Sequence, residues 1–217
     1  MTAAVVRDDE AGRAEAVRIL RAGGIVALPT DTVYGIAADL AIAGGIERLF
    51  EAKRRPADRA IMLLLAYAAQ ASDLAEWPAT AAALAEAFWP GGLTLVLAQR
   101  SGLDLPAVLT GGRPTIGLRV PDHPAPRALA ATLGPLPVTS ANVSGLPEAA
   151  TAAEILAQLG EAIELIIDGG PSHGGPASTV VDCTGAVPRI LRGGAITPEA
   201  IAASLRAASL PEPVAIS

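Results

Sequence analysis

Cysteine and histidine are scarce: the 217 residues include one cysteine, Cys183, and two histidines, His123 and His173. A single cysteine cannot form an internal disulfide, and these three residues make no recognisable metal-binding cluster. We expect Cys183 to be a buried, unreactive thiol on a strand. Aromatic residues make up only 3% of the chain, which argues against a surface that stacks on the bases of single-stranded nucleic acid.

Long apolar runs are missing as well. No stretch approaches the roughly 20 apolar residues of a membrane span, and Arg7, Asp8 and Asp9 lie where a signal peptide would have its apolar core. We therefore expect a soluble, cytoplasmic protein that makes no contact with a membrane. With 51% hydrophobic and 18% charged residues, the chain can bury a sizeable core, which favours one compact domain and leaves two small lobes as the alternative.

Lysine is nearly absent. The formal net charge of -6 argues against a protein that coats nucleic acid non-specifically. All but one of the 16 basic residues are arginines, and the exception is Lys53, within Lys53-Arg54-Arg55-Pro56. Codon usage alone could produce this bias. However, an ammonium group is a compact charge that approaches a single phosphate oxygen, whereas a guanidinium is a planar fork, so Lys53 is a candidate functional residue.

The stretch from Gly23 to Gly35 changes character abruptly. Residues 25–28 are a short apolar run that suits a buried strand, and the following Pro29 cannot continue a central ladder. Hydroxyl groups, a carboxylate and a phenol come next, in Thr30-Asp31-Thr32-Val33-Tyr34. Because open α/β sheets bind ligands beyond the carboxyl ends of their strands, this stretch predicts a strand that ends at a ligand site. A plain polar turn is the alternative.

The rest of the chain alternates between helical and strand patterns, which predicts an α/β fold. Helices are expected at residues 9–22, around 46–53, in the alanine-rich stretch that ends at 88, and at about 126–133, 151–159 and 197–207. Strands are expected at 25–28, 61–65, 93–98, 115–120, 136–139, 165–167, 178–182 and 189–191. Residues 99–113 are expected to form a loop, and those after 210 a loose tail.

Polar side chains accompany several of these strands. They are Thr30 and Thr32, Arg119, Ser140 and Asn142, Ser178, and Arg192. If these side chains converge with Lys53, Arg55 and Arg59, they form a strongly positive pocket on an acidic protein. A single arginine is more often a solvated surface group, but the whole set favours a polyanion such as a nucleoside triphosphate. The phosphate-binding loop, the dinucleotide fingerprint, the kinase signature and the Gly-x-Ser-x-Gly elbow of hydrolases are all missing.

Seven short blocks occur in order between about residues 12 and 205. They are Pro-Thr-Asp-Thr-Val-Tyr-Gly, Lys-Arg-Arg-Pro, Phe-Trp-Pro-Gly-Gly-Leu-Thr, Leu-Arg-Val-Pro-Asp-His, Ser-Ala-Asn-Val-Ser-Gly, Ser-Thr-Val-Val-Asp and Ile-Leu-Arg-Gly-Gly-Ala-Ile. With these blocks the chain resembles the Sua5/YciO/YrdC family, in its short form. The resemblance implies a single-domain twisted mixed α/β sheet flanked by helices, with a large concave, positively charged cavity. The domain would cover residues 9–207, followed by a C-terminal tail at 208–217.

The resemblance also implies an activity. The family member would be an L-threonylcarbamoyladenylate synthase, a nucleotidyltransferase that condenses L-threonine, bicarbonate and ATP and releases pyrophosphate. The product would serve a separate transferase that modifies adenosine 37 of tRNA. Mg²⁺ would arrive with ATP, and no metal site of the protein's own is expected. Catalysis would depend on positioning and charge neutralisation, without a covalent enzyme nucleophile.

By motif position, the resemblance assigns residues to three roles. The catalytic set would be Lys53, Arg55, Ser140 and Asn142. The threonine-binding set would be Thr32, Arg119, Ser140 and Ser178, with Arg119 as a bidentate clamp on the threonine carboxylate. The nucleotide-binding set would be Lys53, Arg55, Arg59, Thr115, Asn142 and Arg192.

Two positions depart from the family pattern. Leu64 stands where the family usually has a histidine near threonine, and Glu148-Ala149-Ala150 replaces a Ser-Pro-Thr segment, which removes a hydroxyl group expected near the nucleotide. These departures leave room for a paralogue that transfers a carbamoyl group to another acceptor. The other alternative is a factor that binds RNA or matures ribosomes with the same cavity and without catalysis, and weak RNA binding is compatible with either function.

Overall fold

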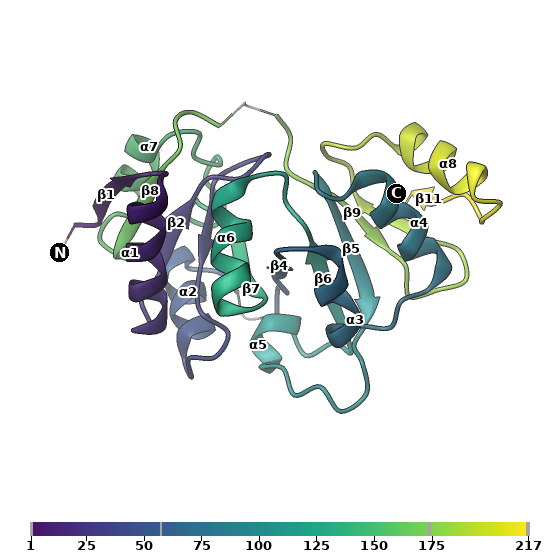
Figure 1. Ribbon diagram of the computed structural model, residues 1–217, viewed down its shortest axis with the longest axis horizontal. Helices are drawn as coiled ribbons and strands as arrows, with labels where there is room; N and C mark the ends of the chain where they lie inside the picture. Colours follow the sequence, from purple (N-terminus) through teal and green to yellow (C-terminus); the bar gives the residue numbers. More distant parts are fainter. Residues whose placement is uncertain (1, 57, 173–174, 216–217) are drawn as a thin grey trace.

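The computed structural model describes residues 2–56, 58–172 and 175–215, and within these ranges eleven strands form one mixed sheet (Figure 1). The strands are β1 (Ala4–Arg7), β2 (Val26–Leu28), β3 (Gly35–Ala37), β4 (Met62–Leu64), β5 (Leu93–Ala98), β6 (Thr115–Arg119), β7 (Leu136–Ser140), β8 (Leu165–Asp168), β9 (Thr179–Asp182), β10 (Arg189–Arg192) and β11 (Val214–Ala215). Their order across the sheet is β1-β8-β2-β3-β7-β4-β6-β5-β9-β10-β11. This confirms the mixed α/β fold expected from the sequence. His173 lies outside the described residues.

Helices cover both faces of the sheet. They are α1 (Glu10–Arg21), α2 (Gly45–Lys53), η1 (Ala68–Gln70), α3 (Ala71–Leu74), α4 (Ala79–Phe88), α5 (Ala107–Thr110), α6 (Pro124–Leu133), α7 (Ala152–Leu159) and α8 (Pro198–Ala207). Figure 1 shows α1 and α6 side by side in front of the same half of the sheet. Leu20 of α1 and Leu129 of α6 share one apolar cluster with Leu28, whereas Leu49 of α2 and Ala27 belong to the second, larger cluster. Neighbouring residues of β2 therefore face opposite layers, as strand geometry requires.

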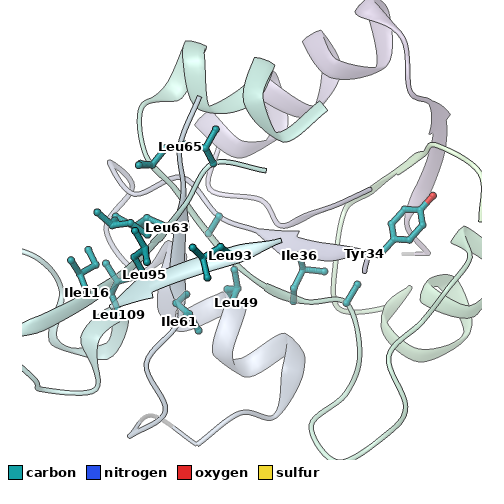
Figure 2. Packing of buried hydrophobic residues seen from close by; sticks show 14 of the residues in the cluster. Tyr34, Ile36, Leu49, Ile61, Leu63, Leu65, Leu93, Leu95, Leu109 and Ile116 are labelled. Atoms are coloured by element: carbon teal, nitrogen blue, oxygen red, sulfur yellow. The ribbon is translucent and has the colours of Figure 1, made fainter. Parts of the chain in front are cut away.

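The larger apolar cluster shows which face of β4, β5 and β6 packs in the core and which face can carry a site. Figure 2 shows Leu63, Leu95 and Ile116 close together, each pointing from its strand into this core. Because successive side chains of a strand point to opposite faces, the neighbours of these residues on β4, β5 and β6 point away from the core. Within the described ranges, no helix combines the length and apolar character needed to cross a bilayer.

Side chains cap the start of three helices, and the sequence predicts this for the helices that begin after Thr151 and Thr197. Asp9 accepts a hydrogen bond from Gly12 N at 2.8 Å, and α1 ends just before Gly23, whose φ is +81°. Thr151 and Thr197 accept from the backbone of the third residue after each of them, both at 3.2 Å. These bonds satisfy backbone donors that would otherwise be unpaired at a helix start.

The structure differs from the sequence expectations mainly in short elements. The strands β1 and β3 were not expected, and α5 lies inside residues 99–113, which were expected to be a loop. The expected loose tail contains β11, which pairs with β10 in parallel, and Val214 N donates to Pro188 O at 3.0 Å. The sheet thus extends beyond the expected domain limits of 9–207 at both ends. Cys183 is buried as expected, although it follows β9 instead of lying within it, and burial raises its pKa to about 12.

Candidate active site

A cavity of about 290 Å³ lies over the adjacent strands β7, β4, β6, β5 and β9. Its floor includes Val138, Met62, Gly117 and Val96, which are paired in one row across four of these strands. The polar residues of its lining are Thr32, Arg55, Thr94, Arg113, Thr115, Arg119, Thr139, Ser140, Glu148, Ser178 and Arg192. Within the described part of the chain, four arginines and a single carboxylate therefore face this space.

Arg119 is buried at one end of the cavity, and its guanidinium is already held by three protein groups. Its Nη2 forms an ion pair with Asp31 Oδ1 at 2.6 Å, Nη1 donates to Thr32 Oγ1 at 3.0 Å, and Nε donates to Gly91 O at 2.9 Å. Burial lowers the pKa of Arg119 from its ordinary value, while the charge of Asp31 acts in the opposite direction. A guanidinium has five N–H groups, so two of them remain for a ligand.

Hydroxyl groups surround this end. Ser178 is buried, its Oγ lies 2.8 Å from Thr94 Oγ1, and Arg192 Nη2 donates to Ser178 O at 2.8 Å. Because Leu95 pairs with Leu118 in antiparallel register, Thr94 lies beside Arg119 on the sheet. The structure therefore brings Thr32, Arg119 and Ser178 together, as expected for the threonine-binding set.

Lys53 lies behind the wall of the cavity and is absent from its lining. It is the last residue of α2, only 1% of it is exposed, and its ammonium points into the turn that follows β7. Nζ donates to Asn142 O at 2.7 Å and Asn142 Oδ1 at 2.9 Å, and it also donates to the carbonyl of Ser140. Burial, and secondly the charge of Arg55, lower the pKa of Lys53 to about 8. These contacts hold the turn, and the expected contact between this ammonium and a phosphate stays a prediction.

The turn held by Lys53 presents Ser140 to the cavity. Ser140 Oγ donates to Asn142 Oδ1 at 2.7 Å, and Asn142 Nδ2 donates to Leu146 O at 2.7 Å. Asn142 is itself buried and lies outside the lining. Lys53, Ser140 and Asn142 therefore form one hydrogen-bonded unit in which Ser140 is the member that can meet a ligand.

Arg55 lies at another part of the wall. Its Nη2 donates to Ala60 O at 2.9 Å, Nε donates to Arg59 O at 3.2 Å, and its guanidinium lies 5.8 Å from the centre of the Phe50 ring. Burial lowers the pKa of Arg55, and the positive charges of Arg59 and Arg192 lower it further. Arg59 is exposed and outside the lining, whereas Thr115 and Arg192 line the cavity as expected for the nucleotide-binding set.

The sequence reasoning gave no site role to five polar residues of this region, namely Asp31, Thr94, Arg113, Thr139 and Glu148. Asp31 lies within the Pro-Thr-Asp-Thr block, and Thr94 ends the Phe-Trp-Pro-Gly-Gly-Leu-Thr block, so both were quoted without a role. Strand alternation in residues 93–98 could have placed Thr94 opposite the buried leucines. Arg113 lies in a loop and no local signal marks it, whereas Glu148 was noted only as part of a departure from the family pattern.

The comparisons with known proteins all indicate the same family. The family model Sua5_yciO_yrdC, described as "Telomere recombination", matches residues 18–194. The Threonylcarbamoyl-AMP synthase of Bacillus subtilis is 40% identical over 192 residues, which is 88% of this chain and 55% of that protein. A relative from Mycobacterium tuberculosis is also 40% identical, over 88% of each chain. This chain thus spans about half the length of the Bacillus relative and most of the mycobacterial one.

A solved structure agrees with this result. The crystal structure of P. abyssi Sua5 complexed with L-threonine has a TM-score of 0.86 and 38% sequence identity, and the match covers 94% of this chain and 60% of that one.

Proposed function

This chain belongs to the Sua5/YciO/YrdC family, and on that basis we propose that it is an L-threonylcarbamoyladenylate synthase. It would condense L-threonine, bicarbonate and ATP to L-threonylcarbamoyl-AMP and release pyrophosphate. One observation supports this most strongly: a single cavity is lined by Arg119, with two unused N–H groups, and by further guanidiniums suited to a triphosphate.

Threonine is proposed to bind at the Arg119 end. The two remaining N–H groups of Arg119 would donate to its α-carboxylate, since paired N–H groups on a guanidinium match the two carboxylate oxygens. Thr32 and Ser178 supply hydroxyl groups beside this position, and both are buried. The ion pair with Asp31 fixes the guanidinium before the substrate arrives, so less side-chain entropy is lost on binding.

The chemistry needs no covalent bond to the enzyme. The amine of threonine attacks bicarbonate and water leaves, or it adds to carbon dioxide and loses a proton to solvent; either route gives a carbamate, and a carbamate oxygen then attacks the α-phosphorus of ATP. The bond from the α-phosphorus to the β-phosphate oxygen breaks, and pyrophosphate leaves. Ser140, Arg55 and Arg192 line the space where these groups would meet, and their role would be to position them and stabilise the developing charge.

Magnesium is proposed to arrive on the triphosphate. The lining offers hydroxyl oxygens, and this donor set fits an ion that keeps its phosphate and water ligands. Bound Mg²⁺ would neutralise phosphate charge. Lys53 would act as a positioning residue, because its ammonium holds the turn that presents Ser140. Transfer of the product to tRNA by a separate enzyme, and a cytoplasmic location, stay predictions from the family resemblance.

The test is release of pyrophosphate by the purified chain. We expect release that requires ATP, threonine and bicarbonate together, and a product with the mass of L-threonylcarbamoyl-AMP. Release that continues without threonine would contradict the proposal, as would RNA binding in the absence of any turnover. Turnover with another acceptor in place of threonine would favour a carbamoyl-transfer paralogue.

A further inference from the structure

We infer that Thr94 is a positioning residue that turns the hydroxyl proton of Ser178 toward a carbamate oxygen of the substrate. This role rests on the proposed function, because the carbamate exists only within that reaction. Thr94 ends the Phe-Trp-Pro-Gly-Gly-Leu-Thr block, where the sequence alone gives it no role. Its role follows from which atoms around Ser178 can donate a hydrogen bond and which can accept one.

Thr94 lies on the cavity side of β5. Figure 2 shows its neighbours Leu93 and Leu95 in the core, so Thr94 between them points to the opposite face. Gly117 on the adjacent strand β6 has no side chain, and a Cβ there would be 3.5 Å from both Thr94 Cγ2 and Met62 Cβ. The side chains of Thr94 and Met62 therefore meet above β6, and Thr94 Oγ1 lies 3.7 Å from Met62 Sδ.

The hydroxyl of Ser178 has one proton to donate and two lone pairs that accept. Arg192 Nη2, which can only donate, lies 3.1 Å from Ser178 Oγ and occupies one lone pair. Thr94 Oγ1 lies 2.8 Å from the same oxygen, and either hydroxyl could be the donor of that bond. If Thr94 donates, both lone pairs are occupied, and the proton of Ser178 has no acceptor among the residues that the structure describes. A ligand in the cavity is then its partner.

The opposite direction of this hydrogen bond depends on Met62. If Ser178 donates to Thr94, the proton of Thr94 is left with the thioether sulfur at 3.7 Å, and a thioether is a weak acceptor. An anionic oxygen beside Ser178 is a much stronger acceptor than this sulfur. Binding of an anion therefore favours the direction in which Thr94 donates to Ser178 and Ser178 donates to the ligand.

The groups around Ser178 indicate which substrate atom it meets. Arg192 places a positive charge and hydrogen-bond donors there, which suits a negative oxygen and disfavours an ammonium group. The threonine carboxylate is proposed to bind Arg119, and Thr94 lies beside Arg119 on the sheet. Because the amine and the carboxylate of an amino acid are on the same carbon, a carbamate formed on that amine would lie close enough to meet Ser178.

The first test compares Thr94→Val, which removes the hydroxyl, with Thr94→Ser, which keeps it. Because the carbamate forms after threonine has bound, Thr94→Val should lower kcat about fivefold and leave KM for threonine unchanged. Thr94→Ser should recover most of this loss, and Thr94→Ala should reproduce it, so the result does not depend on how valine packs. The control Thr110→Val removes a buried hydroxyl outside the cavity lining and should keep the kcat of the wild type.

A double-mutant cycle with Ser178→Ala measures whether Thr94 acts through Ser178. Ser178→Ala alone should lower kcat about 30-fold, as for loss of a hydrogen bond to a charged group. In that background, Thr94→Val should cost less than about twofold more, because its partner is already missing. A further loss of about fivefold without Ser178 would overturn the positioning role, since Thr94 would then act on the substrate by itself.

Two other results would also overturn this role of Thr94. One is a raised KM for threonine with unchanged kcat in Thr94→Val, and the other is a Thr94→Ser protein that is as slow as Thr94→Val. The proposed function fails by a different result, namely a wild-type protein that releases no pyrophosphate from ATP with threonine and bicarbonate present. Since every variant is compared with an active wild type, the two failures can be told apart.

Discussion

The two ends of the cavity differ in how their arginines are held. At one end, the guanidinium of Arg119 is buried, paired with Asp31 at 2.6 Å and bonded to two further groups. Elsewhere in the lining, Arg113 is exposed, and among the described residues Arg55 donates hydrogen bonds only to backbone carbonyls. The guanidinium of Arg119 is thus fixed and paired with a carboxylate, whereas Arg55 and Arg113 form no ion pair with any residue that the structure describes.

This difference suits two different tasks. A small amino acid has to be selected by shape and by a fixed carboxylate contact, and a preorganised group loses little entropy when it binds. Pyrophosphate has to be held during the reaction and then released, and contacts from exposed side chains are weak and salt-sensitive. The comparison leads to the following expectations, from the largest effect to the smallest.

Removal of the fixed guanidinium should have the largest effect. In Arg119→Met, Asp31 loses its partner and threonine loses its carboxylate contact, so kcat/KM for threonine should fall at least ~100-fold. The free energy of unfolding should fall by about 3 kcal/mol. Steady-state kinetics measure kcat/KM, and urea unfolding measures the free energy of unfolding. The control Arg189→Met, which breaks the half-exposed pair with Asp182, should retain turnover. A wild-type kcat/KM for threonine in Arg119→Met would show that Arg119 does not bind the threonine carboxylate.

Lys53 should make turnover depend on pH. Its pKa is lowered to about 8, so Nζ begins to lose its proton above that pH and with it a donor to the turn that presents Ser140. At pH 9 about a tenth of Lys53 would keep its charge, which predicts up to a tenfold loss in kcat. A guanidinium stays charged at this pH, so folded Lys53→Arg should lack the loss relative to its own value at pH 7. An equal loss in both proteins would mean that another group titrates.

The charge of Asp31 can be removed while its shape is kept. Asp31→Asn retains an oxygen acceptor for Arg119 but weakens the bond, because a charged acceptor is replaced by a neutral one. We expect KM for threonine to rise about fivefold with KM for ATP unchanged. Equal changes in both constants would indicate a general structural defect, and Asp31 would then not serve the threonine end in particular.

Glu148 should have the smallest effect. It is the carboxylate that lines the cavity, and it opposes the binding of a polyanion. Glu148→Gln should lower KM for ATP about twofold at low salt, as for a solvent-exposed charge, and the gain should vanish at high salt. A rise in KM for ATP would instead show that this carboxylate assists the nucleotide.

Much of the fold could be predicted from the sequence because its signals are local. Asp9, Thr151 and Thr197 cap helices, and these residues act on backbone groups only three positions away. The strands β3 and β11 escaped prediction because each is only two or three residues long and exists through its pairing with a distant partner. Local patterns carry no information about such pairing.

The functional site also has features that the sequence predicts and features that depend on tertiary contacts. The family resemblance located Thr32, Arg55, Thr115, Arg119, Ser140, Ser178 and Arg192, all of which line the cavity. They could not distinguish a residue that meets the ligand from one that supports its neighbour, and Lys53 and Asn142 proved to be behind the wall. Arg113 reaches the cavity because two loops pack against each other, which is a tertiary contact that no sequence block records.

A crystal structure of this chain with L-threonine and a non-hydrolysable ATP analogue would test the two-ended cavity most directly. We expect the threonine carboxylate on the two remaining N–H groups of Arg119 and the triphosphate beside Arg55 and Arg192. A triphosphate that turns back toward Arg119, or a threonine bound away from it, would contradict this arrangement.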